Sequence, residues 1–552
     1  MNEPSHDPSH DPSHDLDQLA APLDALLVDA ALGPMRRLLP DASTVKLLGR
    51  LAARPGVAAG TLRELGEQLA RIAWGASDLD VKPDRRFADP AWTRNPLLRR
   101  MMHAYLSTGA AVGRLIAEGG LEWRDEQRVR FLAENLLEAL SPSNIPLVNP
   151  ASLKEAVDTA GLSLVRGGLN LVRDMASAPR IPRMVDGSGF TLGGNLATTP
   201  GAVVLRTDVF ELIQYAPATS TVRSVPLVVV PPTINKFYIL DLAPGRSWIE
   251  HLVQSGQQVF VMSWRNPDAR HAEWGLDTYV GAVADALDAT RRICRVEQAV
   301  LAGACSGGIL ACLAAMGQAH RLAGLTLLVT VLDFHDAGRV AALGDRRVAA
   351  AAKQLSRRRG YLDGRALAEV FAWLRPGDLV WHYWVNNYLL GREPPAFDVL
   401  FWNADTTRMT AALHADFVDL AMHGVRDDLS AITTDAYIVG GISDHITPWP
   451  SCYRGTRLLG GASRFVLSTS GHIAALVNPP GNTKASYRAS SETPQDPQQW
   501  LNNTASAPGS WWPDYTAWLE TRCGPSRRAP RQPGGGGLRP LVEAPGTYVF
   551  DS

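Results

Sequence analysis

Residues 298–309 read QAVLAGACSGGI, and this stretch decides the fold class. An apolar run leads into Gly303, Cys305 and Gly307, and residues with helical spacing begin at Ile309. The spacing has the Gly-x-nucleophile-x-Gly form of a sharp strand-to-helix turn, with cysteine in place of serine. Because such a turn exposes its central side chain at the carboxyl end of a buried strand, we interpret Cys305 as the candidate nucleophile.

Two competing interpretations of this turn are weaker. Glycine-rich strand-to-helix turns also bind phosphates, but the turn contains neither the Gly-x-Gly-x-x-Gly pattern nor a Walker lysine. A buried structural thiol is the second alternative for Cys305, but Cys294 and Cys312 are better candidates for that role. The turn alone is a weak signal, so its interpretation depends on the rest of the chain.

Short apolar runs recur through the second half of the chain, and segments with helical spacing lie between most of them. The six runs are residues 225–230, 258–263, 298–302, 324–330, 435–440 and 463–467. Buried strands that alternate with helices indicate a parallel sheet covered on both faces. The second half of the chain therefore belongs to the α/β class.

Two further side chains complete a catalytic set with Cys305. Asp444 follows the run 435–440, and His472 follows the run 463–467, so both lie on loops at the same edge of the sheet as Cys305. The chain order of nucleophile, acid and histidine is that of the α/β-hydrolase fold. The other histidines lack this context. We therefore predict an α/β-hydrolase fold with Cys305, Asp444 and His472 as catalytic residues.

The chain divides into regions of different composition. A His-Asp repeat with frequent proline predicts a disordered tail at the start, and leucine- and alanine-rich helical patterns follow it. We predict a tail at 1–15, a mostly helical N-terminal domain at 16–200 and a catalytic domain at 201–552, with an inserted cap at about 335–430 and a flexible segment at about 526–540.

Two helices in the N-terminal domain have readable bounds. Helical spacing predicts helices over 96–117 and 126–140, with Asp125 as the start signal and Ser141 as the stop signal of the second.

The predicted cap is rich in aromatic residues. They either form the core of the cap or line a channel for an acyl chain, and the sequence favours neither. They are Phe371, Trp373, Trp381, Tyr383, Trp384, Tyr388 and Trp402.

Composition excludes several classes of protein. The chain has 54 Lys plus Arg against 55 Asp plus Glu, which argues against a nucleic-acid binder. It contains no apolar run long enough for a transmembrane helix, and its start does not resemble a signal peptide. Five cysteines without a Cys-x-x-Cys pair indicate reduced thiols in a cytosolic protein and no metal site.

The three catalytic candidates suggest acyl transfer. His472 would take the proton of the Cys305 thiol, and the thiolate would attack a thioester carbonyl. Because exchange between a thiol and a thioester is nearly balanced in energy, a cysteine acyl-enzyme favours transfer over hydrolysis. The oxyanion needs two N–H groups. We expect these from Ser306 and from the loop near Thr233 or Ile234, with Ile234 as the specific candidate.

Six ordered blocks resemble the signature blocks of polyhydroxyalkanoate synthases, and the resemblance runs from about residue 90 to the end of the chain. The blocks are PPTINKFYI (231–239), SWRNP (263–267), GACSGG (303–308), WNADTTR (402–408), DHITPW (444–449) and GHI (471–473). Residues 273–276 and 405–408, with Ala304 and Ser306, look more like the class II, medium-chain branch than class I. The N-terminal His-Asp repeat is not a feature of the family.

The resemblance implies a polymerase that draws (R)-3-hydroxyacyl groups from coenzyme A thioesters. Cys305 would carry the growing polyester chain and His472 would activate it. Asp444 would orient His472 or help to deprotonate the 3-hydroxyl group of the incoming monomer. His445 matches a family histidine, for which we favour a packing role. The family also implies a homodimer on polymer granules in the cytoplasm, with no cofactor and no metal.

Two alternatives remain at this level. A thioesterase or depolymerase on the same fold would share all three catalytic residues, but it would admit water to the acyl-enzyme. A non-catalytic granule-associated scaffold would need none of these residues, yet all three are present in the expected order.

Overall fold

The computed structural model of the protein describes most of the chain. The predicted tail at 1–15 and His445 lie outside the described residues. The described residues are 30, 40–81, 83–176, 179–332, 342–425, 428–444 and 446–552.

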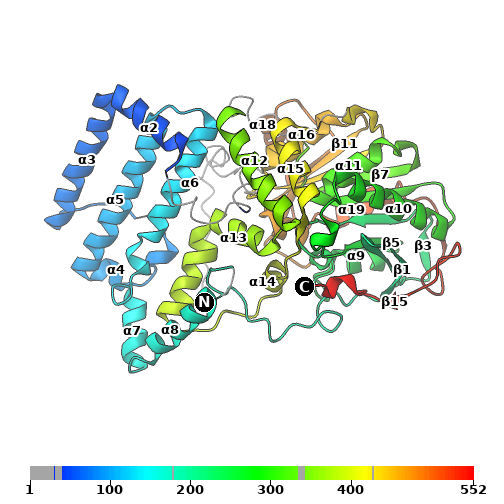
Figure 1. The fold of residues 1–552 in the computed structure, drawn as a ribbon, viewed down its shortest axis with the longest axis horizontal. Coiled ribbons are helices and arrows are strands. Elements are labelled where there is room, and N and C mark those ends of the chain that lie inside the picture. The colour runs from blue at the N-terminus through cyan, green and yellow to red at the C-terminus, as the bar shows by residue number, and fades with distance from the viewer. Residues whose placement is uncertain are drawn as a thin grey trace.

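Within these residues, one sheet of eleven strands forms the centre of the molecule (Figure 1). Its strands are β1 (Gly201–Arg206), β2 (Phe210–Tyr215), β4 (Leu227–Val230), β5 (Val259–Trp264), β6 (Ala299–Ala304), β7 (Leu322–Leu328), β10 (Ala436–Gly441), β11 (Ser463–Ser468), β12 (Ser486–Ser490), β13 (Ser506–Pro508) and β15 (Val542–Glu543). They lie in the order β13-β12-β11-β10-β7-β6-β4-β5-β2-β1-β15.

The six apolar runs of the sequence form the parallel part of this sheet. Neighbouring strands among β5, β4, β6, β7, β10 and β11 all pair in parallel. Antiparallel strands extend the sheet at both ends. Parallel strands place their carboxyl ends at one edge, so the loops after β4, β6, β10 and β11 meet there. The predicted parallel sheet is confirmed.

Both faces of the sheet are covered by helices. Along β4, Val228 and Val230 pack in one core cluster, whereas Leu227 and Val229 pack in another on the opposite face. This alternation follows from the two-residue period of a strand. The first face carries α10 (Leu276–Cys294), α11 (Ser306–Met316), α16 (Trp449–Leu458) and α18 (Pro497–Asn503). The second carries α9 (Trp248–Gln254), α17 (His472–Leu476) and α19 (Trp512–Glu520).

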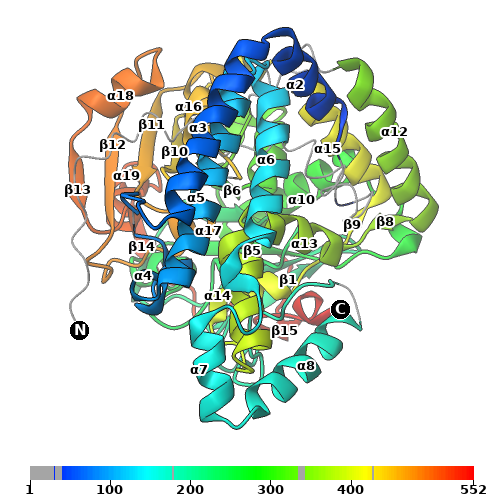
Figure 2. The same cartoon turned by 90° about the vertical axis from the view of Figure 1, so that its left-hand side faces the viewer.

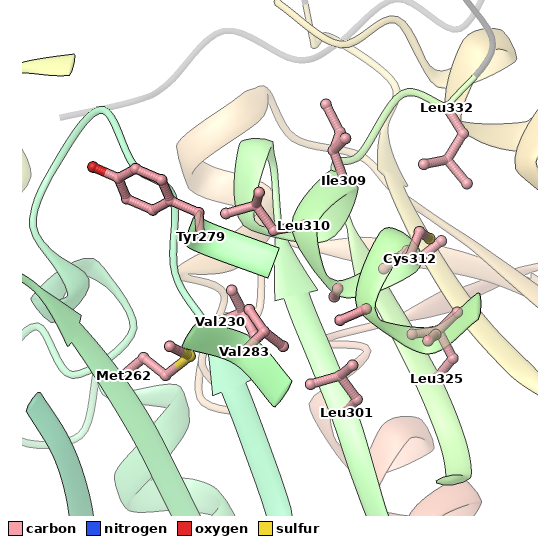
Figure 3. Packing of buried hydrophobic residues seen from close by; sticks show 14 of the residues in the cluster. Val230, Met262, Tyr279, Val283, Leu301, Ile309, Leu310, Cys312, Leu325 and Leu332 are labelled. Atoms are coloured by element: carbon pink, nitrogen blue, oxygen red, sulfur yellow. The ribbon is translucent and has the colours of Figure 1, made fainter. Parts of the chain in front are cut away.

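Figure 3 shows the first of these cores. Val230 and Leu301 project from neighbouring strands toward Val283 on α10 and Leu310 on α11. All four side chains are at most 1% exposed. Apolar burial of this completeness on both sides of the strands fixes the position of the turn between β6 and α11.

The N-terminal helices stand together at one side of the molecule, at the left of Figure 1 and in front in Figure 2. They have small cores of their own, one around Ile116 and one around Trp92. The helices are α2 (Ala42–Ala53), α3 (Pro55–Ala73), α4 (Ala91–Arg94), α5 (Pro96–Glu118), α6 (Trp123–Ala139), α7 (Pro150–Asp158) and α8 (Leu162–Met175). None of the helices in the described part of the chain is long and apolar enough to cross a membrane.

One predicted boundary in this layer is wrong. The helix expected at 126–140 is α6, which begins at Trp123, so Asp125 lies inside its first turn. The Asp125 carboxylate instead accepts hydrogen bonds from Ser43 Oγ and Lys46 Nζ, both at 2.6 Å. The tertiary contact with α2 therefore replaces the capping role that the sequence indicates.

A long segment separates β7 from β10. We call it the cap, and its role as a cap stays a prediction. Trp384 donates from Nε1 to Asn144 O at 3.1 Å, and Tyr388 donates from Oη to Asp174 Oδ2 at 2.9 Å. These two aromatics therefore join the cap to the N-terminal helices. The cap contains α12 (Ala342–Arg359), β8 (Tyr361–Leu362), α13 (Gly364–Leu374), the π-helical turns η8 (Gly377–Trp381) and η9 (Trp384–Leu389), α14 (Asp398–Ala404), β9 (Met409–Thr410) and α15 (Ala411–His423).

Helix α8 packs closely against η9. Its inner face carries Ser163, Gly167 and Asn170, all buried. Asn170 Nδ2 donates to Asn387 O at 3.2 Å, and a Cβ on Gly167 would lie 1.9 Å from Tyr388 O. The small side chains allow the two backbones to approach.

The C-terminal segment returns to the sheet. The region predicted to be flexible begins with β14 (Ser526–Arg528), which pairs with β3 (Thr221–Arg223). Its flexibility stays a prediction. Short 3₁₀ turns elsewhere are η2 (Arg85–Phe87), η3 (Pro142–Asn144), η4 (Phe237–Ile239), η5 (Ala269–His271), η6 (Ala319–Arg321), η10 (Leu429–Ala431) and η11 (Tyr548–Phe550).

Candidate active site

Cys305 occupies the single residue between β6 and α11. Its backbone has φ +51° and ψ −120°, a strained conformation for a residue with a side chain. Its N–H donates to Leu328 O on β7 at 2.9 Å, and its carbonyl accepts from the Gly308 N–H at 2.9 Å. The turn therefore holds the Cys305 thiol at the carboxyl edge of the parallel strands.

Two glycines make this sharp turn sterically possible. A Cβ on Gly307 would lie 2.4 Å from the carbonyl oxygens of Val230 and Pro231. A Cβ on Gly308 would lie 2.0 Å from Thr330 Oγ1. Any larger residue at either position would push α11 away from the sheet and displace Cys305.

Asp444 and His472 meet at the same edge. Asp444 lies on the loop after β10, and His472 is the first residue of α17, after β11. His472 Nδ1 lies 2.7 Å from Asp444 Oδ2, and both side chains are buried. Asp444 Oδ1 also accepts from the N–H groups of Ile446 and Thr447, each at 2.9 Å. The carboxylate is therefore fixed before it orients the imidazole.

The charges of this group are mutually stabilising. Burial lowers the pKa of His472. The Asp444 carboxylate and a hydrogen bond with Cys305 raise the same pKa by more than burial lowers it, so the net pKa lies well above its usual value. Burial raises the pKa of Asp444, but the charge of His472 and the hydrogen bonds from His472 and Thr447 hold it below its usual value. The structure thus brings Cys305, His472 and Asp444 together, and the raised pKa makes His472 a stronger base than a free imidazole.

Thr447 is a member of this group that the sequence analysis missed. Its hydroxyl donates to Asp444 Oδ2 at 2.6 Å and lies 3.1 Å from His472 Nδ1. A threonine three residues after an aspartate commonly bonds back to it, so this spacing was an available signal.

The two expected oxyanion donors lie beside the turn. Ser306 is the first residue of α11, and the first N–H groups of a helix have no acceptor within the helix. The Thr233 N–H donates to Ser306 Oγ at 3.0 Å, which occupies it. We find no protein acceptor for the Ile234 N–H among the described residues. Of the two loop candidates, Ile234 therefore has the available donor.

The other cysteines are buried thiols. Burial raises the pKa of Cys294 to about 11, and it raises that of Cys312 further. Cys452 donates from Sγ to Thr447 O at 3.5 Å, and burial together with the nearby Asp444 charge raises its pKa. In the described part of the chain, no cluster of histidine, cysteine and acidic side chains could hold a metal ion.

Two family models match the chain. The model described as "Poly-beta-hydroxybutyrate polymerase (PhaC) N-terminus" matches residues 83–252. The model described as "alpha/beta hydrolase fold" matches residues 226–479, a range that contains Cys305, Asp444 and His472.

Similar proteins extend this assignment over nearly the full length. The chain is 44% identical to poly(3-hydroxyalkanoate) polymerase 2 of Ectopseudomonas oleovorans, over 92% of this chain and 94% of the relative. It is 42% identical to polymerase 1 of the same organism, over 97% and 98%. It is 39% identical to the poly(3-hydroxyalkanoate) polymerase subunit PhaC of Cupriavidus necator, over 84% and 83%. Among solved structures, a hydrolase from Pseudomonas aeruginosa matches at 19% identity and a TM-score of 0.34, over 50% of this chain and 92% of that chain. The resemblance in the sequence blocks is thereby confirmed: the chain belongs to the poly(3-hydroxyalkanoate) polymerase family and is an acyltransferase with the α/β-hydrolase fold.

Proposed function

We propose that this protein takes (R)-3-hydroxyacyl groups from coenzyme A thioesters and joins them into a polyester through an acyl-enzyme on Cys305. The observation that carries the proposal is the arrangement of Cys305 on its strained turn with His472 and Asp444. A thiol that is hydrogen-bonded to an imidazole becomes an activated nucleophile when a carboxylate also hydrogen-bonds to that imidazole.

In the first step, His472 takes the proton of the Cys305 thiol, and the sulfur attacks the thioester carbonyl. The oxyanion accepts hydrogen bonds from the N–H groups of Ser306 and Ile234. The carbon–sulfur bond to coenzyme A then breaks, and the leaving thiolate takes the proton from His472. The acyl group is left on Cys305 as a thioester of nearly equal energy.

In the second step, a 3-hydroxyl oxygen attacks the thioester on Cys305. The hydroxyl proton passes to His472, an ester bond forms, and Cys305 leaves as a thiolate. When the attacking hydroxyl belongs to an incoming hydroxyacyl-coenzyme A, the chain grows by one unit and returns to Cys305 with release of coenzyme A. The 2.7 Å contact between His472 and Asp444 supports an orienting role for Asp444.

We further propose that the polyester lies against helices α7 and α8. The product is a neutral aliphatic polymer, and helix α8 has an apolar outer face: Leu162, Val165, Leu169 and Val172 are 55%, 60%, 62% and 69% exposed. Residues 150–175 contain three basic and three acidic side chains, so their charge does not favour an anionic surface. This face supports attachment to polymer granules in the cytoplasm.

Three finer points follow from the family resemblance. We propose that the protein belongs to the medium-chain class, forms a homodimer and needs no cofactor. The thioester already carries an activated acyl group, so the two steps above require no further cofactor.

The test is coenzyme A release from (R)-3-hydroxyacyl-coenzyme A substrates, with the product recovered as polymer or free acid. We expect polymer from the wild type and none from Cys305→Ala. Cys312→Ala is the matched control because Cys312 is a buried thiol on α11 outside the site.

Each outcome points to one conclusion. Free acid in place of polymer would identify a thioesterase. Unchanged activity of Cys305→Ala would remove Cys305 from the mechanism.

A further inference from the structure

The loop after β4 is held in place by a segment of the cap. Residues 231–236 join β4 to η4, and they contain two prolines and no regular helix or strand. Trp402 donates from Nε1 to Lys236 O at 2.7 Å. Lys236 Nζ, which is buried, lies 2.8 Å from Asp405 Oδ1. The loop and the segment 402–408 therefore form one bonded unit, although they are far apart in the sequence.

Thr407 makes the bonds closest to the expected oxyanion donor. Its hydroxyl donates to Thr233 O at 3.1 Å, and its N–H donates to Ile234 O at 3.1 Å. On the other side of the loop, the Thr233 N–H donates to Ser306 Oγ at 3.0 Å. Three successive peptide groups are thus held. The Ile234 N–H, which has no protein acceptor among the described residues, lies between the anchors. Thr407 itself is 4% exposed.

The geometry of the peptide group lets these anchors set the orientation of the Ile234 N–H. The carbonyl of Thr233 and the N–H of Ile234 belong to one planar trans peptide, so they point in opposite directions. A hydrogen bond that holds the Thr233 carbonyl therefore also sets the direction of the Ile234 N–H. Stabilisation of an oxyanion depends on donors that are oriented before the reaction.

We propose that Thr407 is a positioning residue for acyl transfer, because its hydroxyl fixes the peptide whose N–H, that of Ile234, completes the oxyanion hole. Thr407 acts through this peptide and does not touch the substrate. The inference depends on the proposed acyl-enzyme. It adds to the site a residue that lies outside both the turn at Cys305 and the three catalytic residues.

A second anchor supports the same segment. The N–H of Arg408 donates to Asn266 Oδ1 at 2.8 Å, and Asn266 Nδ2 lies 3.5 Å from Asp551 O. The neighbour of Thr407 is thereby tied to the loop after β5 and to the C-terminal segment. These hydrogen bonds limit the movement of Thr407 and so help to keep its bond to the Thr233 carbonyl in place.

The experiment compares Thr407→Val, which keeps the shape but loses the hydroxyl, with Thr407→Ser, which keeps the hydroxyl. Thr504→Val is the matched control, because Thr504 is also buried and donates from Oγ1 to a backbone carbonyl, that of Trp500, at 2.7 Å. Acylation of Cys305 is measured as the burst of p-nitrophenolate from p-nitrophenyl butyrate and as coenzyme A release from (R)-3-hydroxyacyl-coenzyme A. Alkylation of Cys305 by iodoacetamide is measured in parallel, because that displacement forms no oxyanion.

We expect Thr407→Val to slow acylation at least about tenfold at unchanged KM, short of the roughly 100- to 1,000-fold that loss of a whole donor costs. Alkylation of Cys305 should keep the wild-type rate. Thr407→Ser should retain most of the acylation rate, and Thr504→Val should match the wild type.

Full acylation by Thr407→Val would overturn the proposal, and so would an equal loss of alkylation, because that would indicate general damage to the turn. A normal burst without polymer from the wild type would overturn the polymerase function and leave the comparison of the Thr407 variants intact. Absence of both burst and coenzyme A release from the wild type would overturn both proposals.

Discussion

Cys305, His472 and Asp444 each depend on a different local cause. Cys305 is held in a backbone conformation that costs about 1–3 kcal/mol, which the close packing of α11 on the sheet offsets. His472 depends on the Asp444 carboxylate for its orientation and charge, and Asp444 depends on the backbone N–H groups after it. Loss of any one of these supports should change the chemistry of Cys305 without removing its thiol.

Asp444→Asn should lower the pKa of His472, because the carboxylate is the main group that raises it. Without the raised pKa, His472 would be a weaker acceptor for the proton of the Cys305 thiol. We expect acylation at pH 7 to fall by roughly 10²- to 10⁴-fold, the range that general acid–base catalysis contributes, because His472 would lose both orientation and basicity. Titration of the His472 imidazole by NMR measures the pKa directly.

The same shift predicts a dependence of stability on pH. A raised pKa in the folded state stabilises the fold fully below the unfolded pKa of about 6.5. That stabilisation disappears as the pH rises through the higher folded pKa. The gap in unfolding free energy between wild type and Asp444→Asn should therefore narrow as the solution becomes more alkaline. Asp435→Asn, at a partly exposed pair with Arg522, is the control. An unchanged His472 pKa in Asp444→Asn would show that the Asp444 carboxylate is not the group that raises this pKa.

The sequence predicted the residues that lie next to a recognisable turn or strand end. Cys305, Asp444 and His472 each follow a buried strand, so their order and spacing were readable. Thr407 was not readable as a positioning residue, because its hydroxyl bonds to Thr233, 174 positions away. Only the fold shows which loop carbonyl lies opposite that hydroxyl.

At the level of elements, helix α8 reverses the usual arrangement of a surface helix. An apolar stripe at helical spacing commonly faces the core. Here the small and polar face of α8 packs against η9, and the apolar stripe is exposed. Periodicity alone would place the apolar stripe in the interior, and the structure shows the opposite face buried. Gly167 shows why, because only a glycine admits the backbone of Tyr388 at that distance.

Gly167→Ala should destabilise this contact, because its Cβ would lie 1.9 Å from Tyr388 O. We expect a loss of about 1–3 kcal/mol, as for overpacking. Gly168→Ala is the matched control, because its Cβ would meet nothing within 4 Å and alanine favours a helix. Thermal unfolding should thus separate the two neighbours, with a lower Tm for Gly167→Ala only. Equal Tm values would show that α8 and η9 are not closely packed in solution.

At the scale of the whole molecule, the exposed apolar residues concentrate near α7 and α8. Of the 21 large apolar side chains that are exposed in the described residues, eleven lie between 136 and 172. Figure 2 shows α7 and α8 next to α14 of the cap. Tyr388 of the cap donates from Oη to Asp174 on α8. Contact with the polyester, as proposed above, would give an energetic reason for the exposure of this surface.

The double variant Val165→Ser and Leu169→Ser should therefore weaken attachment to the polymer without slowing early turnover. Burial of two such side chains contributes about 1.5–3 kcal/mol each, so the affinity for polymer should fall at least about tenfold. Sedimentation of the protein with preformed polymer measures attachment, and coenzyme A release before polymer accumulates measures turnover. Val45→Ser with Leu48→Ser on α2 is the control, because that pair is equally exposed, at 66% and 61%. If both double variants sediment alike, the attachment surface is not α8, because the two pairs differ in place and not in exposure. A parallel loss of turnover would instead show that α8 supports the site through the cap.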